Sequence, residues 1–81
     1  MNDSTEHIGT RIKAARQEQG LTRTKLAAEL AITETTVTRW EQGRNKPGIS
    51  QLLGLSRVLQ VSPEYLLGAD EPNGDPVEAA A

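Results

Sequence analysis

The sequence predicts an all-α domain, on three observations. Apolar residues recur at helical spacing, as Ile8, Ile12 and Ala15 do, whereas the alternation typical of a strand never lasts. Serine or threonine stands where several helices would begin and can cap their first turns. Glycine and proline divide the chain into segments of helical length. With 81 residues, the chain fits one domain with a single modest core.

Taken in order, these signals predict five helices. The first begins at Ile8 and stops before Gly20, and the second follows the cap residue Thr22 and runs to about Leu30. The third spans about residues 34–42, between the cap Thr33 and Gly43. After a break at Pro47 and Gly48, the fourth covers about 49–59. In the fifth, which is short, Ser62 is the cap and Pro63 the first helical residue.

Helical spacing also predicts which side chains are buried. Trp40 lies three residues after Val37, so it belongs to the core rather than to a base-stacking surface. Tyr65 fits a half-buried core position and a surface contact equally well, and His7 is expected to be exposed and without a role. The expected core is Ile8, Ile12, Ala15, Leu26, Ala27, Leu30, Val37, Trp40, Leu52, Leu55, Leu59, Val61, Leu66 and Leu67.

Composition argues against several classes of function. The chain has no cysteine and one histidine, which leaves no disulfide and no His/Cys metal site. No catalytic triad, paired carboxylates or phosphate-binding loop is present, so we expect neither an enzyme nor a cofactor or small-molecule substrate. No apolar run is long enough to span a membrane and no secretory signal opens the chain, so we expect a cytoplasmic protein without membrane contact.

Charge is divided unevenly along the chain. Residues 8–48 hold eight basic and four acidic residues, a net charge of +4, whereas residues 49–81 hold one basic and five acidic residues, a net charge of −4. The first part therefore suits a polyanion and the second does not. Residues 69–81 are acidic and rich in proline and glycine, so we expect a folded domain over 8–68 and a disordered acidic tail after it.

The second and third helices would form a helix-turn-helix. Only Ala31 and Ile32 separate the second helix from the cap Thr33, so the two helices must cross steeply. One face of the third helix then packs on the core, and the other is free to enter a DNA major groove. The residues expected on that outer face are Glu34, Thr35, Thr36, Thr38 and Arg39.

The residue types on the outer face fit the reading of bases. Threonine is a mediocre helix former, but its short side chain offers a hydroxyl and a methyl group to base edges. Arg39 can bind guanine through a bidentate fork, and Glu34 can accept a hydrogen bond from cytosine. We expect base contacts from Glu34, Thr35, Thr36 and Arg39.

Beyond Gly43 the chain is basic. The loop of residues 43–46 would present backbone N–H groups and cations to a sugar-phosphate strand. The expected phosphate contacts are Thr22, Arg23, Thr33, Thr38, Gln42, Arg44, Asn45 and Lys46.

Several motifs in fixed order carry a family resemblance. They are "RIKAAR", "GLT" followed by "LA", "W-E-x-G-x-x-x-P" and "L-x-V-S-x-x-x-LL". Over about residues 8–68 this pattern resembles the phage repressor and Cro type of helix-turn-helix, also called XRE-type. The resemblance implies a five-helix, lambda-repressor-like domain that represses transcription as a homodimer on a two-fold operator in double-stranded DNA. It also implies an ion pair between Arg16 and Glu41. With no coiled-coil segment in the chain, we expect the dimer to be weak without DNA.

Four positions depart from the family pattern. Arg23 stands where glutamine usually binds a phosphate, and Glu34 where glutamine often reads adenine. Ala31 and Gln60 stand where glycine is common, and Ala31 in a left-handed turn would cost roughly 1 kcal/mol.

A second function uses the same fold: a protein-interaction module, such as an antitoxin or antirepressor, whose acidic half meets a partner. The basic residues gathered around the third helix favour DNA binding.

Overall fold

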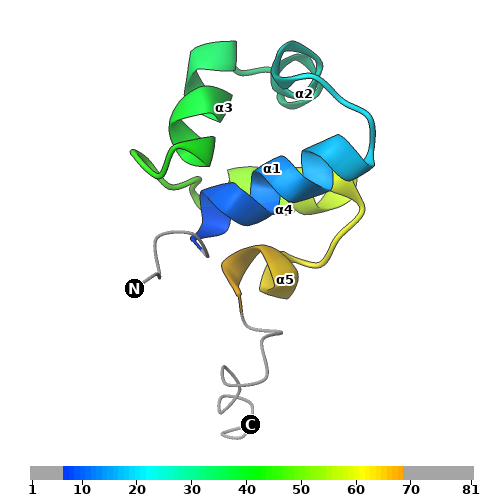
Figure 1. The fold of residues 1–81 in the computed structure, drawn as a ribbon, viewed down its shortest axis with the longest axis vertical. Helices are drawn as coiled ribbons and strands as arrows, with labels where there is room; N and C mark the ends of the chain where they lie inside the picture. Colours follow the sequence, from blue (N-terminus) through cyan, green and yellow to red (C-terminus); the bar gives the residue numbers. More distant parts are fainter. Residues whose placement is uncertain (1–6, 69–81) are drawn as a thin grey trace, which may run out of the picture.

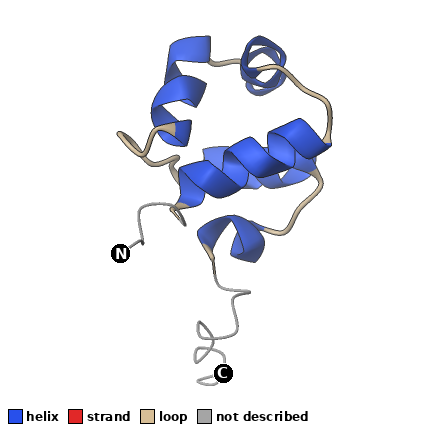
Figure 2. Ribbon diagram, in the orientation of Figure 1, coloured by secondary structure: helices blue, strands red, loops and turns tan. Residues whose placement is uncertain are grey.

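In a computed structural model of the chain, residues 7–68 are described and fold as five α-helices without a strand among them (Figures 1 and 2). The all-α prediction is confirmed, and the helices begin and end within a residue or two of the predicted positions. The predicted acidic tail, residues 69–81, lies outside the described residues. The helices are α1 (Ile8–Glu18), α2 (Arg23–Leu30), α3 (Glu34–Glu41), α4 (Ile49–Leu59) and α5 (Pro63–Leu67).

Side-chain caps fix the starts of the helices. The hydroxyl groups of Thr22, Thr33 and Ser62 each accept a hydrogen bond from a backbone N–H three residues later, as predicted. The expectation for His7 was wrong. Its Nδ1 accepts from the N–H of Thr10 at 3.2 Å, so His7 caps α1, and its side chain is partly buried.

Two helices end in the left-handed conformation without glycine. Ala31, after α2, has φ 59° and ψ 41°, and Gln60, after α4, has φ 60° and ψ 44°. The strained turn expected at Ala31 is therefore confirmed. At each site the N–H still bonds to carbonyls of the preceding turn, which holds the strained residue in place.

The core lies where the five helices meet. Trp40 is buried, as predicted, and Tyr65 is partly buried against the core. The expectation for Leu67 was wrong, because its side chain is 61% exposed. α5 has only one and a half turns, so its two successive leucines point in different directions and only Leu66 turns inward. The buried core is Ile12, Ala15, Leu26, Ala27, Val37, Trp40, Leu52, Leu55, Leu59 and Leu66.

α3 packs against both α1 and α2 (Figure 1). The start of α1 approaches the end of α3 so closely that a Cβ atom on Gly9 would lie 1.9 Å from the backbone oxygen of Trp40. Glycine is therefore required at position 9, although glycine weakens a helix. This contact fixes the end of α3 against the rest of the domain.

α5 closes the other side of α1. The guanidinium carbon of Arg11 lies 5.5 Å from the ring centre of Tyr65, a cation-π distance, and the Arg11 side chain is largely buried. Among residues 7–68, no helix has the length and apolar character that crossing a membrane would require.

Candidate nucleic-acid interface

The exposed side of α3 forms a shallow hollow of about 410 Å³. Three of the four residues predicted to read bases line it, together with three of those predicted to bind phosphate. Hydroxyl, amide, carboxylate and guanidinium groups thus share one surface, while Val37 and Trp40 of the same helix face the core. The lining residues are Glu34, Thr35, Thr38, Arg39, Gln42 and Arg44.

Thr36, the fourth predicted base reader, is placed differently. Its side chain is partly buried, and its hydroxyl lies 3.0 Å from that of Thr33. The N–H of Thr36 also donates to the Thr33 hydroxyl at 3.2 Å. Thr36 is therefore tied to the start of α3 and lies outside the hollow, although its hydroxyl retains capacity for a further hydrogen bond.

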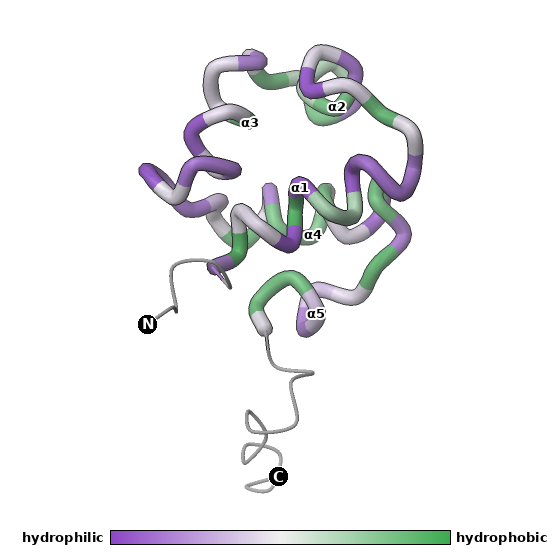
Figure 3. The backbone as a smooth tube through the Cα atoms, in the orientation of Figure 1, coloured by the Kyte–Doolittle hydropathy of each residue, from purple (hydrophilic) through white to green (hydrophobic). Residues whose placement is uncertain are grey.

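The loop after α3 offers cations, and three of its backbone N–H groups are already bonded within the domain. The N–H groups of Gly43, Arg44 and Asn45 all donate to carbonyl oxygens of Trp40 or Arg39, so the expectation that they are free for phosphate was wrong. These bonds complete the last turn of α3. The side chains of Arg44, Asn45 and Lys46 remain exposed, and the loop is strongly hydrophilic (Figure 3).

Two of the predicted phosphate ligands also serve as caps. Thr22 and Thr33 are exposed at the starts of α2 and α3, and their hydroxyl oxygens accept bonds from Lys25 and Thr36. A capping hydroxyl that accepts through its oxygen still has its own hydrogen to donate. Capping and phosphate binding are therefore compatible at Thr22.

A buried carboxylate ties α3 to α1 and α2. The Arg16 Nε lies 2.7 Å from one oxygen of Glu41, and its Nη2 lies 3.2 Å from the other. Arg23 donates its Nε to the same carboxylate at 2.9 Å. Glu41 is thus held by two arginines, whereas the family resemblance implied only Arg16, and the Glu41 side chain is 1% exposed. This acidic group therefore does not face a polyanion approaching α3.

Glu34 has a partner that the sequence did not indicate. The hydroxyl of Thr24, on α2, donates to its carboxylate at 3.0 Å, and both side chains are exposed. No pattern in the sequence singles out Thr24. Only the steep crossing of α2 and α3 brings it to the first residue of α3.

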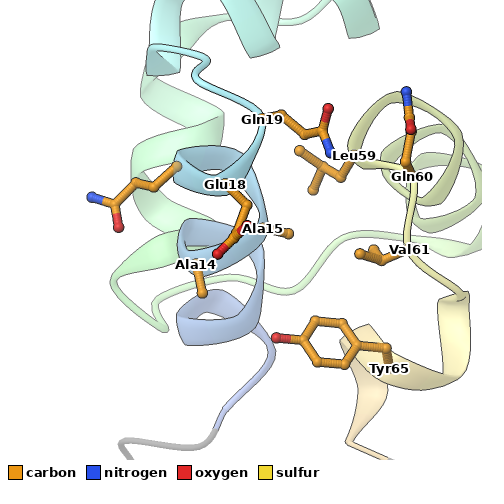
Figure 4. Close-up of a pocket in the computed structure, with 9 residues that line it drawn as sticks. Ala14, Ala15, Glu18, Gln19, Leu59, Gln60, Val61 and Tyr65 are labelled. Atoms are coloured by element: carbon orange, nitrogen blue, oxygen red, sulfur yellow. The ribbon is translucent and has the colours of Figure 1, made fainter.

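A separate hollow of about 590 Å³ lies between α1 and the turn from α4 to α5 (Figure 4). Its lining is made of glutamine, alanine and aliphatic side chains with Glu18 and Tyr65, and no arginine or lysine contributes to it. Its lining shares no residue with the hollow on α3, so the two hollows are separate sites.

Comparison with known proteins places this geometry in a family. Residues 12–66 match the family model described as helix-turn-helix. The chain is 41% identical over 64 residues to the HTH-type transcriptional regulator DicA of Escherichia coli strain K12, covering 79% of this chain and 47% of DicA. It is 33% identical over 67 residues to repressor protein C2 of Salmonella phage P22, covering 83% of this chain and 31% of the repressor. The chain thus spans between about a third and half of the length of these curated relatives.

Solved structures give the same result. A crystal structure of the P22 c2 repressor in complex with a synthetic operator superposes with a TM-score of 0.73 at 32% identity, covering 85% of this chain and 97% of that one. A solution structure of the P22 c2 DNA-binding domain superposes with a TM-score of 0.75 at 29% identity, covering 94% and 93% of the two chains. The chain belongs to the XRE-type helix-turn-helix family of phage repressors and related transcriptional regulators.

Proposed function

We propose that this domain binds double-stranded DNA sequence-specifically and regulates transcription, as a repressor, by placing α3 in the major groove. One observation carries the proposal: α3 and the residues just after it turn hydroxyl, amide, carboxylate and guanidinium groups outward around Arg39, while the second carboxylate of α3, that of Glu41, is paired with two arginines inside the domain. A helix built only for stability has no need of four threonines on and before it. The named regulators and the operator complex among its relatives support the same function.

In the proposed complex, Arg39, Thr35 and Glu34 meet base edges, and Thr36 does so with the hydrogen-bonding capacity that its bond to Thr33 leaves free. Phosphates meet the cations of the loop and the side chains around the hollow. The described residues 7–68 carry nine basic and five acidic side chains, a surplus that favours a polyanion. The predicted phosphate ligands are Thr22, Arg23, Thr33, Thr38, Gln42, Arg44, Asn45 and Lys46.

Each proposed contact uses a hydrogen-bond donor, an acceptor or a fixed cation rather than a nucleophile or an acid-base pair. The proposed role is therefore DNA binding without catalysis. The proposed location is the cytoplasm.

A second copy of the chain completes the proposal. One recognition helix reads only a few base pairs, so specificity calls for two half-sites roughly 34 Å apart on a two-fold operator. Three large apolar side chains are exposed and available for the contact: Ile49 is 75%, Leu53 49% and Leu67 61% exposed. Ile49 and Leu53 lie one turn apart on α4, and Leu67 lines a small cleft with Pro47. So few side chains predict a dimer that is weak without DNA.

Selection of bound duplexes from a random DNA pool tests the proposal. We expect enrichment of one sequence with two-fold symmetry and two half-sites about one helical turn apart. If the selected duplexes share no sequence, and the protein binds them no more tightly than scrambled DNA, the proposed function is wrong.

A further inference from the structure

The arginine at the start of α2 contacts the last residue of α3. The Nε of Arg23 lies 2.9 Å from Oε1 of Glu41, although the two residues are 18 positions apart in sequence. Because Arg23 is the first residue of α2 and Glu41 the last of α3, this contact joins the start of one helix of the helix-turn-helix to the end of the other. Arg23 is therefore one of the two arginines that hold the last residue of the recognition helix.

The two arginines around Glu41 are used differently. Arg16 is buried, with its Nε and Nη2 on the carboxylate and its Nη1 on the carbonyl oxygen of Leu21 at 2.8 Å. The side chain of Arg23 is 35% exposed. Within residues 7–68 its guanidinium makes one hydrogen bond, through Nε, which leaves the N–H groups of Nη1 and Nη2 for another acceptor. Arg16 is structural, whereas the terminal N–H groups of Arg23 are available to a further acceptor.

The charges of this cluster do not cancel. One carboxylate faces two guanidinium groups, so Arg16, Arg23 and Glu41 together carry a net charge of +1 at the edge of the helix-turn-helix. The helix dipole of α2 adds partial positive charge at its first residue, where Arg23 stands. The surplus attracts an anion to the exposed edge of Arg23.

We propose that Arg23 bridges Glu41 and a DNA phosphate, and so is a positioning residue for the recognition helix. Its Nε stays on Glu41 while its terminal nitrogens bind the phosphate, which fixes α3 relative to the DNA backbone. The inference rests on the proposed function and extends it: Arg23 affects sequence preference without touching a base. An arginine that only attracts phosphate would raise affinity for all sequences equally.

The variant Arg23→Lys separates the two roles. Lysine keeps the positive charge but lacks the planar fork that serves two acceptors at once. Binding to scrambled DNA and its salt dependence should change little, because the same number of counterions is released. The ratio of affinities for matched and scrambled duplexes should fall about tenfold, because α3 is less well oriented toward the bases. The matched control Lys25→Arg, an exchange between the same two residue types on α2, should leave the ratio unchanged.

A measurement without DNA tests the contact itself. In a double-mutant cycle of Arg23→Gln and Glu41→Gln, followed by urea unfolding, the two substitutions should not be additive, because they remove the same bond. Additive effects would overturn the bridge.

Binding data separate the failure of this inference from that of the proposed function. If the wild-type protein discriminates matched from scrambled DNA and Arg23→Lys retains the full ratio, the bridge is wrong and DNA binding stands. If the wild type does not discriminate, both are wrong.

Discussion

Replacing Ala31 with glycine should stabilise the domain. Ala31 is exposed and ends α2 in the left-handed conformation, with φ 59° and ψ 41°. Its N–H bonds to the carbonyl oxygens of Ala27 and Ala28, and glycine can keep both bonds. The substitution therefore removes only the clash between the Cβ atom and the backbone.

The size of the gain follows from two opposing effects. The left-handed conformation costs a residue with a Cβ atom about 1 to 2 kcal/mol relative to glycine. Glycine has more freedom in the unfolded chain, which offsets about 0.4 to 1 kcal/mol of this. We expect a net stabilisation near the middle of the difference between these ranges, about 0.8 kcal/mol, and since 1 kcal/mol shifts the Tm of a small domain by roughly 4 to 8 °C, a rise of about 3 to 6 °C.

Thermal unfolding followed by far-ultraviolet circular dichroism measures the effect. The control is Ala28→Gly, because Ala28 is also exposed but lies inside α2, where glycine should lower the free energy of unfolding by about 1 kcal/mol. A Tm for Ala31→Gly that falls as it does for Ala28→Gly would show that residue 31 is not left-handed. DNA preference should be the same in both proteins, since neither side chain belongs to α3.

Three further predictions concern packing, specificity and assembly. Gly9→Ala should lower the Tm strongly or prevent folding, because the new Cβ atom would meet a backbone carbonyl of α3. Gly48→Ala is the control and should have a much smaller effect, because a Cβ atom there would lie no closer than 3.7 Å to its nearest neighbour. Thr24→Val, which removes the hydroxyl bonded to Glu34, should weaken the preference at one base pair in binding to a panel of single-base variants, and Thr24→Ser should not. The free protein should sediment as a monomer at micromolar concentration, and a tight dimer in the absence of DNA would contradict the weak contact. Ile49→Ser should reduce binding to the two-fold site and leave binding to a single half-site unchanged.

Helix boundaries were predictable from sequence because the signals that set them are local. A capping hydroxyl such as Thr33 acts on an amide three residues away, and Gly43 ends α3 by its own conformational freedom. Most of the core followed from periodicity in the longer helices. Leu67 did not, because a helix of five residues is too short for periodicity to show which leucine turns inward.

The site was predictable only in part, for a similar reason. The outer face of α3 follows from its own sequence, whereas the hollow around Arg39, which Gln42 and Arg44 also line, was not predicted. The bonds from Arg23 to Glu41 and from Thr24 to Glu34 depend on how steeply two helices cross, which no local pattern determines. The family resemblance indicated Arg16 as the partner of Glu41, but Arg23 departs from the family pattern, so the resemblance did not indicate its contact.

The most direct test of the central claim, that α3 reads bases while the loop after it holds phosphate, compares Arg39→Ala with Lys46→Ala. Arg39 lines the hollow on α3, and Lys46 is exposed in the loop. Both variants are titrated against matched and scrambled duplexes over a range of salt concentrations. Arg39→Ala should lose roughly 1 to 3 kcal/mol on the matched duplex and much less on the scrambled one. Lys46→Ala should weaken both about equally and reduce the salt slope by about one per protomer. If neither variant changes DNA affinity while one abolishes binding to a protein partner, the domain is an interaction module and does not read DNA through α3.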